Sequence, residues 1–322
     1  MSVSVILVNW NSGNLLKKCL RHLELQTVSP ECVFVVDNAS TDGSADIKDT
    51  SGRVKVLKMA TNLGFAAANN RALTQCTTEF VVLLNLDAIP EPDWIEQLLK
   101  AAVKYSDYAA FGSRQLSYEN PEVLDGIGDS YHLSGLVWRN RHGQRLRSFD
   151  RINREIFSPC AAAAMYRRST LIEIGGFDED YFCYVEDVDL GFRLRLSGYR
   201  AIYVSDAIIR HMGSVITGGQ HGDFSVYHGH RNLVWTYIKN MPGVLFWFLL
   251  PLHLLLNIVT ICLFTLRGQL AVILKAKLDA FKSLPQALKK RKHIQKKRVA
   301  KIQDIWQVLD KHLLPQKKTS LL

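Results

Sequence analysis

Two polar clusters in the sequence combine the residue types and the spacing that metal and proton chemistry require. The first, Asn85-Leu86-Asp87, directly follows the apolar run of residues 80–84. If that run is a strand, Asn85 and Asp87 project from one side of it, because side chains alternate along an extended chain. A divalent cation that bridges a diphosphate could then bind both, since hard cations prefer oxygen ligands. The alternative is an ordinary turn that ends the strand and begins the next helix.

The second cluster is Glu186-Asp187-Val188-Asp189, in which three carboxylates occupy four positions at the start of an expected helix. Acidic residues at a helix start are often simple caps. Three carboxylates repel one another unless a cation or a proton compensates, so their density favours a functional site with a proton-accepting role. His211 follows the next expected strand and is a candidate third metal ligand, with a structural histidine as the alternative.

A third polar segment, residues 37–44 (Asp-Asn-Ala-Ser-Thr-Asp-Gly-Ser), joins a strand end to a helix start. Its Ser, Thr and Asp residues are favourable N-caps, so Asp42 is expected to cap a helix over residues 44–49. Asp37 can accept a hydrogen bond from the N–H of a pyrimidine ring. We therefore expect Asp37 to bind a ligand, while the alternative for the whole segment is helix capping alone.

These clusters follow short β-branched runs that alternate with helical patterns over the first 115 residues. In this part, strands are expected at residues 3–9, 33–37, 54–58 and 80–84, and helices at 15–25, 44–49 and 66–74. Farther along the chain, helices are expected at 171–175 and 187–197 and a strand at 201–204. The alternation predicts an α/β fold with a mostly parallel central sheet. Ligands bind beyond the carboxyl ends of such strands, which is where the polar clusters lie.

Positive charge is concentrated at the C-terminal end of the chain. The formal net charge is +10, but residues 267–322 hold 15 Lys and Arg against 3 Asp, which leaves residues 1–266 at −2. An enzyme acting on nucleic acid would spread positive charge along its substrate groove, so we expect no nucleic-acid partner. A basic tail that follows an apolar segment suits an anionic membrane surface instead.

That apolar segment, residues 245–266, has 22 residues, near the ~20 that a membrane span needs. Pro251 and two polar residues interrupt it, so a re-entrant or interface-lying helix pair fits as well as a clean span. Residues 289–301 add eight positive charges in a helical register. Together these segments predict membrane attachment, and the alternative is a core helix pair beside a solvated basic face. Scattered cysteines and an N-terminus unlike a signal peptide favour a cytosolic location.

Six blocks of the sequence resemble, in order, the glycosyltransferase family 2 enzymes of the GT-A fold, particularly their bacterial rhamnosyltransferase-like branch. The resemblance extends from Val3 to about Asn240, some three quarters of the chain. Its blocks are Val-Asn-Trp-Asn-Ser12, Val-Val-Asp-Asn-Ala-Ser-Thr-Asp-Gly-Ser44, Asn-Leu-Gly-Phe-Ala-Ala-Ala-Asn-Asn70, Leu-Asn-Leu-Asp-Ala88, Gly-Gly-Phe-Asp-Glu179 and Glu-Asp-Val-Asp-Leu190. The resemblance implies a Rossmann-like sheet and inverting transfer of a sugar from a nucleotide-diphosphate donor.

The resemblance also implies roles for individual residues. Asp87 and His211 are expected to bind a divalent cation, Mg²⁺ or Mn²⁺, and Asp187 to act as general base, with Glu186 beside it. Where the family has a first acidic residue in its metal motif, this chain has Asn85, so one carboxylate and one amide would replace two carboxylates. The residues expected to bind the nucleotide sugar are Asn9, Asp37, Asn38, Asn62, Gly64, Asn85 and Asp189.

The expected protein has a catalytic domain, residues 1–240, and a helical membrane-attachment region, residues 241–322. Residues 1–115 form the nucleotide-binding half of the catalytic domain, and residues 116–240 form the half with the acceptor loops and the base. The expected reaction moves rhamnose or another hexose from a dTDP- or UDP-linked donor to a glycan or polyprenyl-linked glycan at the cytoplasmic face of the inner membrane. The alternative is a non-catalytic protein that binds sugar nucleotides or glycan lipids at the membrane.

Overall fold

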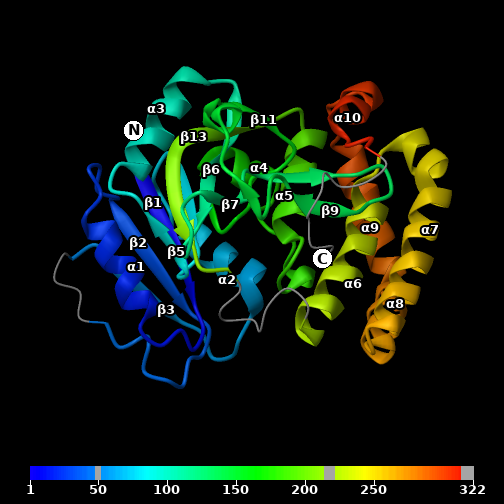
Figure 1. Ribbon diagram of the computed structural model, residues 1–322, viewed down its shortest axis with the longest axis horizontal. Coiled ribbons are helices and arrows are strands. Elements are labelled where there is room, and N and C mark those ends of the chain that lie inside the picture. The colour runs from blue at the N-terminus through cyan, green and yellow to red at the C-terminus, as the bar shows by residue number, and fades with distance from the viewer. Residues whose placement is uncertain (48–51, 214–221, 313–322) are drawn as a thin grey trace.

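A mixed β-sheet forms the centre of the molecule, with helices on both faces and a group of C-terminal helices along one side (Figure 1). The computed structural model describes residues 1–47, 52–213 and 222–312. Within these residues the sheet has 11 strands, and its main path runs β10-β7-β6-β12-β4-β1-β2-β3. This arrangement confirms the predicted α/β class.

The N-terminal part of the sheet is parallel, as the alternating pattern predicts. Its strands are β1 (Val3–Asn9), β2 (Cys32–Asp37), β3 (Val54–Lys58) and β4 (Phe80–Leu84), connected in part by helices α1 (Leu15–Glu24) and α2 (Gly64–Leu73). β1 pairs with β2 so that Asn9 lies opposite Asp37. The carboxyl ends of the parallel strands therefore meet at one edge, and their polar residues gather there.

Strands that are mostly antiparallel extend the sheet on the other side of β4. They are β5 (Ala88–Pro90), β6 (Tyr108–Ser117), β7 (Val123–Gly126), β10 (Gln144–Arg145), β11 (Arg154–Ile156), β12 (Ala163–Arg167) and β13 (Arg200–His211), while β8 (Asp129–Tyr131) and β9 (Val137–Arg139) form a separate hairpin. β13 is longer than predicted, since its second half pairs with β5. This pairing sets His211 opposite Ala88 and so brings it beside the metal-motif residue Asp87.

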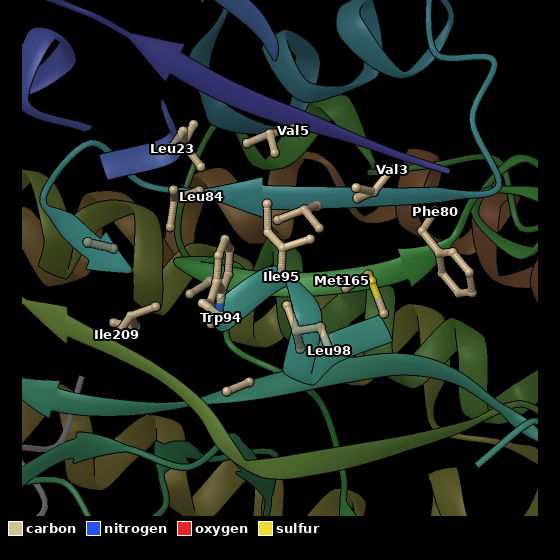
Figure 2. Packing of buried hydrophobic residues seen from close by; sticks show 14 of the residues in the cluster. Val3, Val5, Leu23, Phe80, Leu84, Trp94, Ile95, Leu98, Met165 and Ile209 are labelled. Atoms are coloured by element: carbon tan, nitrogen blue, oxygen red, sulfur yellow. The ribbon is translucent and has the colours of Figure 1, made fainter. Parts of the chain in front are cut away.

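Each face of the sheet is covered by helices that bury an apolar stripe. α1 and α3 (Trp94–Lys104) pack on one face, where Trp94, Ile95 and Leu98 of α3 group with Val5 and Leu84 (Figure 2). On the other face, α2, α4 (Arg168–Glu173) and α5 (Glu186–Leu196) form a second core. The short 3₁₀ helices η1 (Ser148–Arg151) and η2 (Glu179–Tyr181) lie in the connections.

Helix α5, which begins with the acidic cluster, is buried on two sides. Leu190 and Leu194 pack against the sheet, whereas Val188, Phe192 and Leu196 pack toward the C-terminal helices. Those helices are α6 (Asp223–Asn240), α7 (Gly243–Leu266), α8 (Leu270–Lys282), α9 (Leu284–Lys296) and α10 (Ile302–Val308). Because α5 shares this core with α7 to α10, residues on both sides of the predicted boundary at residue 240 hold the catalytic helix in place.

Two local predictions are wrong. Residues 44–47 form a turn and not a helix, because Asp42 bonds the backbone N–H groups of Gly13 and Ser44, which favours a loop; residues 48 and 49 of that prediction lie outside the described residues. The basic helix α9 ends at Lys296, so the run to Lys301 leaves it. For the apolar segment, where a helix pair and a continuous span were both expected possibilities, the structure has one continuous helix, α7, that includes Pro251.

Candidate active site

A cavity of about 540 Å³ opens at the carboxyl ends of the parallel strands. This volume is in the range of roughly 300–1,000 Å³ that is common for small-molecule sites. The loops after β1, β2 and β4 form one side of the cavity, and β7 to β9 together with the start of α5 form the other. The cavity thus brings together residues from both halves of the predicted catalytic domain.

Asp87 and His211 lie together at the cavity wall. His211 Nε2 is 3.3 Å from Asp87 Oδ1, and this buried ring nitrogen has no hydrogen-bond partner. The other ring nitrogen, Nδ1, lies 2.9 Å from Asp125 Oδ2. Burial disfavours a charged ring, but Asp125 and Asp87 outweigh it and raise the pKa of His211 to about 9. The site therefore attracts positive charge, and the sequence alone had not suggested Asp125.

The nucleotide-side residues separate into two groups. Asn38, Asn62, Gly64 and Asn85 line the cavity. Asn9 and Asp37 are buried behind it, and Asn9 Nδ2 donates hydrogen bonds to Asp37, Ser40 and Ser44. With these hydrogen bonds, Asn9 and Asp37 support the loop over residues 38–44. The geometry favours this role over the predicted direct contact with a ligand.

Gly64 begins α2 with a positive φ of 80°, which glycine adopts without steric cost. A Cβ at this position would lie 2.6 Å from the Phe182 side chain and backbone. The close approach joins the nucleotide-side loop to the segment that precedes α5. In that segment Phe182, Tyr184 and Val185 all have positive φ, a strain that concentrates at functional sites.

Glu186 and Asp187 line the cavity at the start of α5. Asp187 accepts hydrogen bonds from the backbone N–H groups of Ala161 (3.1 Å) and Val188 (2.9 Å), while Glu186 Oε2 is buried without a partner. Burial raises the pKa of both carboxyl groups, and for Glu186 the neighbouring Asp187 raises it further. Carboxyl groups with raised pKa values are suited to accept protons near neutral pH.

Two further residues that lie beside the acidic start of α5 were not predicted from the sequence. Asp129 and Cys160 offer ligand atoms that, with an oxygen of Asp187, all lie within 4.8 Å of one another, which is a spacing that a metal ion could use. Arg139 Nη2 lies 2.8 Å from Cys160 Sγ, however, and its positive charge disfavours a cation at this point. The irregular segment between residues 116 and 159 gave no periodic signal that could have identified Asp129.

Asp189 is turned away from the cavity, although it belongs to the same acidic motif. Its carboxylate is fully buried and bonds Arg193 (2.8 Å), Asn240 (2.8 Å) and the Tyr181 hydroxyl (3.1 Å), and it pairs with Lys239 (2.8 Å). These partners hold the pKa of Asp189 well below its usual range in spite of burial. The geometry therefore favours a structural role for Asp189 in place of the predicted contact with the donor.

Solved structures with the same arrangement of sheet and helices are glycosyltransferases. The chain is similar to GalNAc-T7 in its crystal structure with UDP, GalNAc and Mn²⁺, with a TM-score of 0.60 and 14% identity over 74% of this chain and 48% of that one. It is also similar to the mannosyltransferase PcManGT from Pyrobaculum calidifontis in complex with GDP-Man and Mn²⁺, with a TM-score of 0.53 and 18% identity over 95% and 87% of the two chains. At these identities the likeness establishes the fold, which is GT-A as predicted.

The sequence matches the family model described as glycosyl transferase family 2 over residues 4–175, more than half of the chain. The chain therefore belongs to glycosyl transferase family 2. It is 29% identical over 290 residues to an N-acetylglucosaminyl-diphospho-decaprenol L-rhamnosyltransferase of Mycobacterium tuberculosis, which covers 83% of this chain and 90% of the relative. It is 24% identical over 218 residues to an O-antigen chain rhamnosyltransferase of Salmonella typhimurium, over 66% of each chain. These matches confirm the predicted family and its rhamnosyltransferase-like branch.

Proposed function

We propose that this family 2 glycosyltransferase transfers rhamnose or another hexose, with inversion, from a dTDP- or UDP-linked donor to a glycan or polyprenyl-linked glycan. The observation that carries the proposal is that one cavity holds both the Asp87–His211 pair and the acidic start of α5. The relatives, named as rhamnosyltransferases of a lipid-linked sugar and of an O-antigen chain, support the sugar and the acceptor class. The reaction would belong to cell-surface polysaccharide assembly.

A divalent cation fits the Asp87 side of the cavity. The buried Nε2 of His211 has no hydrogen-bond partner and faces the Asp87 carboxylate, so the two side chains offer one nitrogen and one oxygen ligand at the same place. Carboxylate and imidazole together suit Mn²⁺, and carboxylate suits Mg²⁺. Asp87 and His211 would hold the cation, which when bound would stabilise the negative charge that departs on the diphosphate.

The nucleotide would lie along the first side of the cavity. Asn38 and Asn62 line the cavity there and brace the start of α2, since their side-chain oxygens accept hydrogen bonds from the N–H groups of Leu63 and Gly64. The diphosphate would lie between this helix start and Asp87, where the cation would neutralise it. Asn85 adds an amide beside the cation position.

The proton-accepting role falls to Asp187 in this proposal, with Glu186 as the neighbouring carboxyl group. As the acceptor oxygen bonds to the anomeric carbon, its O–H bond breaks and the proton passes to Asp187. The bond from the anomeric carbon to the diphosphate oxygen breaks on the opposite side, and its electron pair leaves with the diphosphate. This single displacement inverts the anomeric configuration.

The C-terminal helices support membrane attachment of the region from residue 241 onward. α7 is long and apolar enough to cross a membrane, with a mean hydropathy of 2.2 in its most apolar window, of which 22% is buried. Its outward side chains recur at helical spacing, and they include Trp247, Phe248, Leu255 and Ile258. The attachment would place the catalytic cavity at the cytoplasmic face, where anionic lipids attract the basic residues of α9.

The packing of α7 favours a position in the plane of the membrane surface over a span. Leu245 and Leu249 of α7 are buried in a core shared with α5 and α6, and Phe264 packs on Ile273 of α8. α8 carries several charged residues, among them Lys275, so a span would draw charge into the lipid interior. An in-plane helix pair keeps these charges in water while its apolar face enters the interface.

A donor panel tests the proposed reaction. Full-length protein is incubated with dTDP- and UDP-linked hexoses, a polyprenyl diphosphate-linked sugar and Mn²⁺ or Mg²⁺. Release of nucleoside diphosphate together with a lengthened lipid-linked glycan supports the proposal. Tight binding of a donor with no release in the presence of any acceptor would favour the non-catalytic alternative.

A further inference from the structure

Arg139 of β9 contacts two acidic residues of the cavity, Asp125 beside His211 and Asp129 near Asp187. Its Nη1 lies 2.7 Å from Asp125 Oδ2, and its Nε lies 3.8 Å from Asp129 Oδ1. Its Nη2 donates to Cys160 Sγ at 2.8 Å. All four residues line the cavity, and none of them belongs to the six sequence blocks of the family resemblance.

We propose that Arg139 is a positioning residue that joins the cation side of the cavity to the proton-accepting side. Through Asp125 it fixes the orientation of His211. Beside Asp129 and Cys160, it also places a positive charge near Asp187. This inference rests on the proposed function, because it takes His211 as a cation ligand and Asp187 as the base.

The first half of the inference concerns the histidine ring. Asp125 accepts a hydrogen bond from His211 Nδ1, which leaves Nε2 free to face Asp87. A carboxylate on the far ring nitrogen fixes the tautomer and the orientation of a metal-binding histidine. Arg139 Nη1 donates a hydrogen bond to the same oxygen, Asp125 Oδ2, at 2.7 Å, and so holds this carboxylate in place beside the ring.

The second half concerns the carboxyl group of Asp187. Burial and the Asp187 charge raise the pKa of Asp129 to about 8, so Asp129 takes up a proton before Asp187 does. Arg139 favours the ionised form of Asp187. The other titratable groups that face Asp187 are Glu186 on α5, Cys160 before β12 and Tyr166 on β12.

The backbone of β7 is shaped to admit the arginine. A Cβ at Gly126 would lie 2.2 Å from Arg139 Cδ and 2.3 Å from its Cγ. The φ of Gly126 is not positive, so an alanine is compatible with the backbone and would act through the displaced side chain. Gly126→Ala therefore moves Arg139 without removing any charged group.

The test uses full-length variants and two independent measurements. One is the dissociation constant of Mn²⁺, with and without UDP, from the electron paramagnetic resonance signal of free Mn²⁺. The other is the pH at which kcat/KM falls to half on the acid side. The variants are Asp125→Asn, Asp129→Asn, Arg139→Gln and Gly126→Ala. Arg145→Met is the matched control, because the Arg145 side chain on β10 is exposed.

Each variant has its own expected signature. Asp125→Asn should weaken Mn²⁺ binding by about 10- to 100-fold, the usual cost of losing a histidine's outer partner, and leave the acid limb in place. Asp129→Asn should keep Mn²⁺ affinity and leave the acid limb in place, because Asp129, with a pKa of about 8, is already uncharged where Asp187 titrates. Arg139→Gln should weaken Mn²⁺ binding and move the limb to higher pH, because Asp187 loses a favourable charge.

Gly126→Ala should reproduce both effects of Arg139→Gln, and this keeps the test decisive if the glutamine variant does not fold. Unchanged Mn²⁺ affinity and an unchanged acid limb in both variants, beside an active wild type, would overturn the inference alone. A wild type that neither binds Mn²⁺ nor transfers sugar would overturn the proposed function and the inference with it.

Discussion

Two regions of the cavity, one around His211 and one at the start of α5, differ in the charge that they favour. Beside His211 the Asp125 carboxylate is kept ionised, as its lowered pKa and the raised pKa of the histidine indicate. At the start of α5, burial raises the pKa of Glu186 and Asp187, so those groups hold protons more readily. One side therefore suits a cation and the other suits a proton, which is the division that a metal-assisted displacement needs.

The largest expected effect comes from the proton-accepting side. Asp187→Asn should lower the transfer rate by about 10²–10⁴-fold, because the amide keeps the shape of the carboxylate and cannot take the acceptor proton. Donor affinity, measured by calorimetry, should stay nearly constant. Glu186→Gln is the matched variant, since it removes the adjacent carboxylate. If Asp187→Asn keeps more than half of the wild-type rate while Glu186→Gln loses it, Glu186 is the base.

A smaller loss, in this case of metal-dependent donor affinity, is expected where the cation would bind. Asp87→Ala should remove the gain in donor affinity that Mn²⁺ or Mg²⁺ provides. The loss should be at least roughly 10- to 100-fold, which is the cost of losing a residue that only holds a metal ligand in place. Calorimetric titration of the donor with and without the cation measures this gain, and the exposed Glu119→Ala serves as control. A metal-dependent gain that survives in Asp87→Ala would place the cation elsewhere, for instance among Asp129, Cys160 and Asp187.

The sequence reveals the first side of the cavity far better than the second. Parallel β1 to β4 follow from β-branched runs, and polar residues such as Asn38 and Asp87 could be placed at their ends because parallel strands end at one edge. Asp125 and Arg139 come from short strands with no period to recognise. Asp189 belongs to the same motif as Asp187, but its carboxylate pairs with Lys239 and turns away from the cavity. The spacing of the two residues in the sequence does not reveal this difference.

The pH dependence of transfer by the wild-type protein tests the proton-accepting region of the cavity by itself. Transfer needs an ionised Asp187, whose pKa burial raises above its ordinary value of 3.8. Activity should therefore be lost as pH falls through that raised pKa, by about tenfold per pH unit below it. A profile of kcat/KM measured under saturating Mn²⁺ checks this. Full activity retained at pH 4 would contradict the assignment of a buried carboxylate as base.

The smallest effect is expected at the outer face of α7. Serine at both Trp247 and Phe248, which are 70% and 69% exposed, should weaken binding to anionic vesicles by at least about tenfold. Burying one large apolar side chain is worth roughly 1.5–3 kcal/mol, and about 1.4 kcal/mol is tenfold. Co-sedimentation with vesicles measures the binding, and Val103→Ser, at a position of α3 whose side chain is 63% exposed, is the control. Equal binding of both variants would contradict attachment through α7.

The anomeric configuration of the product tests the central claim most directly. A donor of known configuration is converted by the full-length protein, and nuclear magnetic resonance of the product gives the configuration of the new linkage. We predict the configuration opposite to that of the donor, formed only when a divalent cation is present and not by Asp187→Asn. A product that retains the donor's configuration would contradict a single displacement with Asp187 as its base.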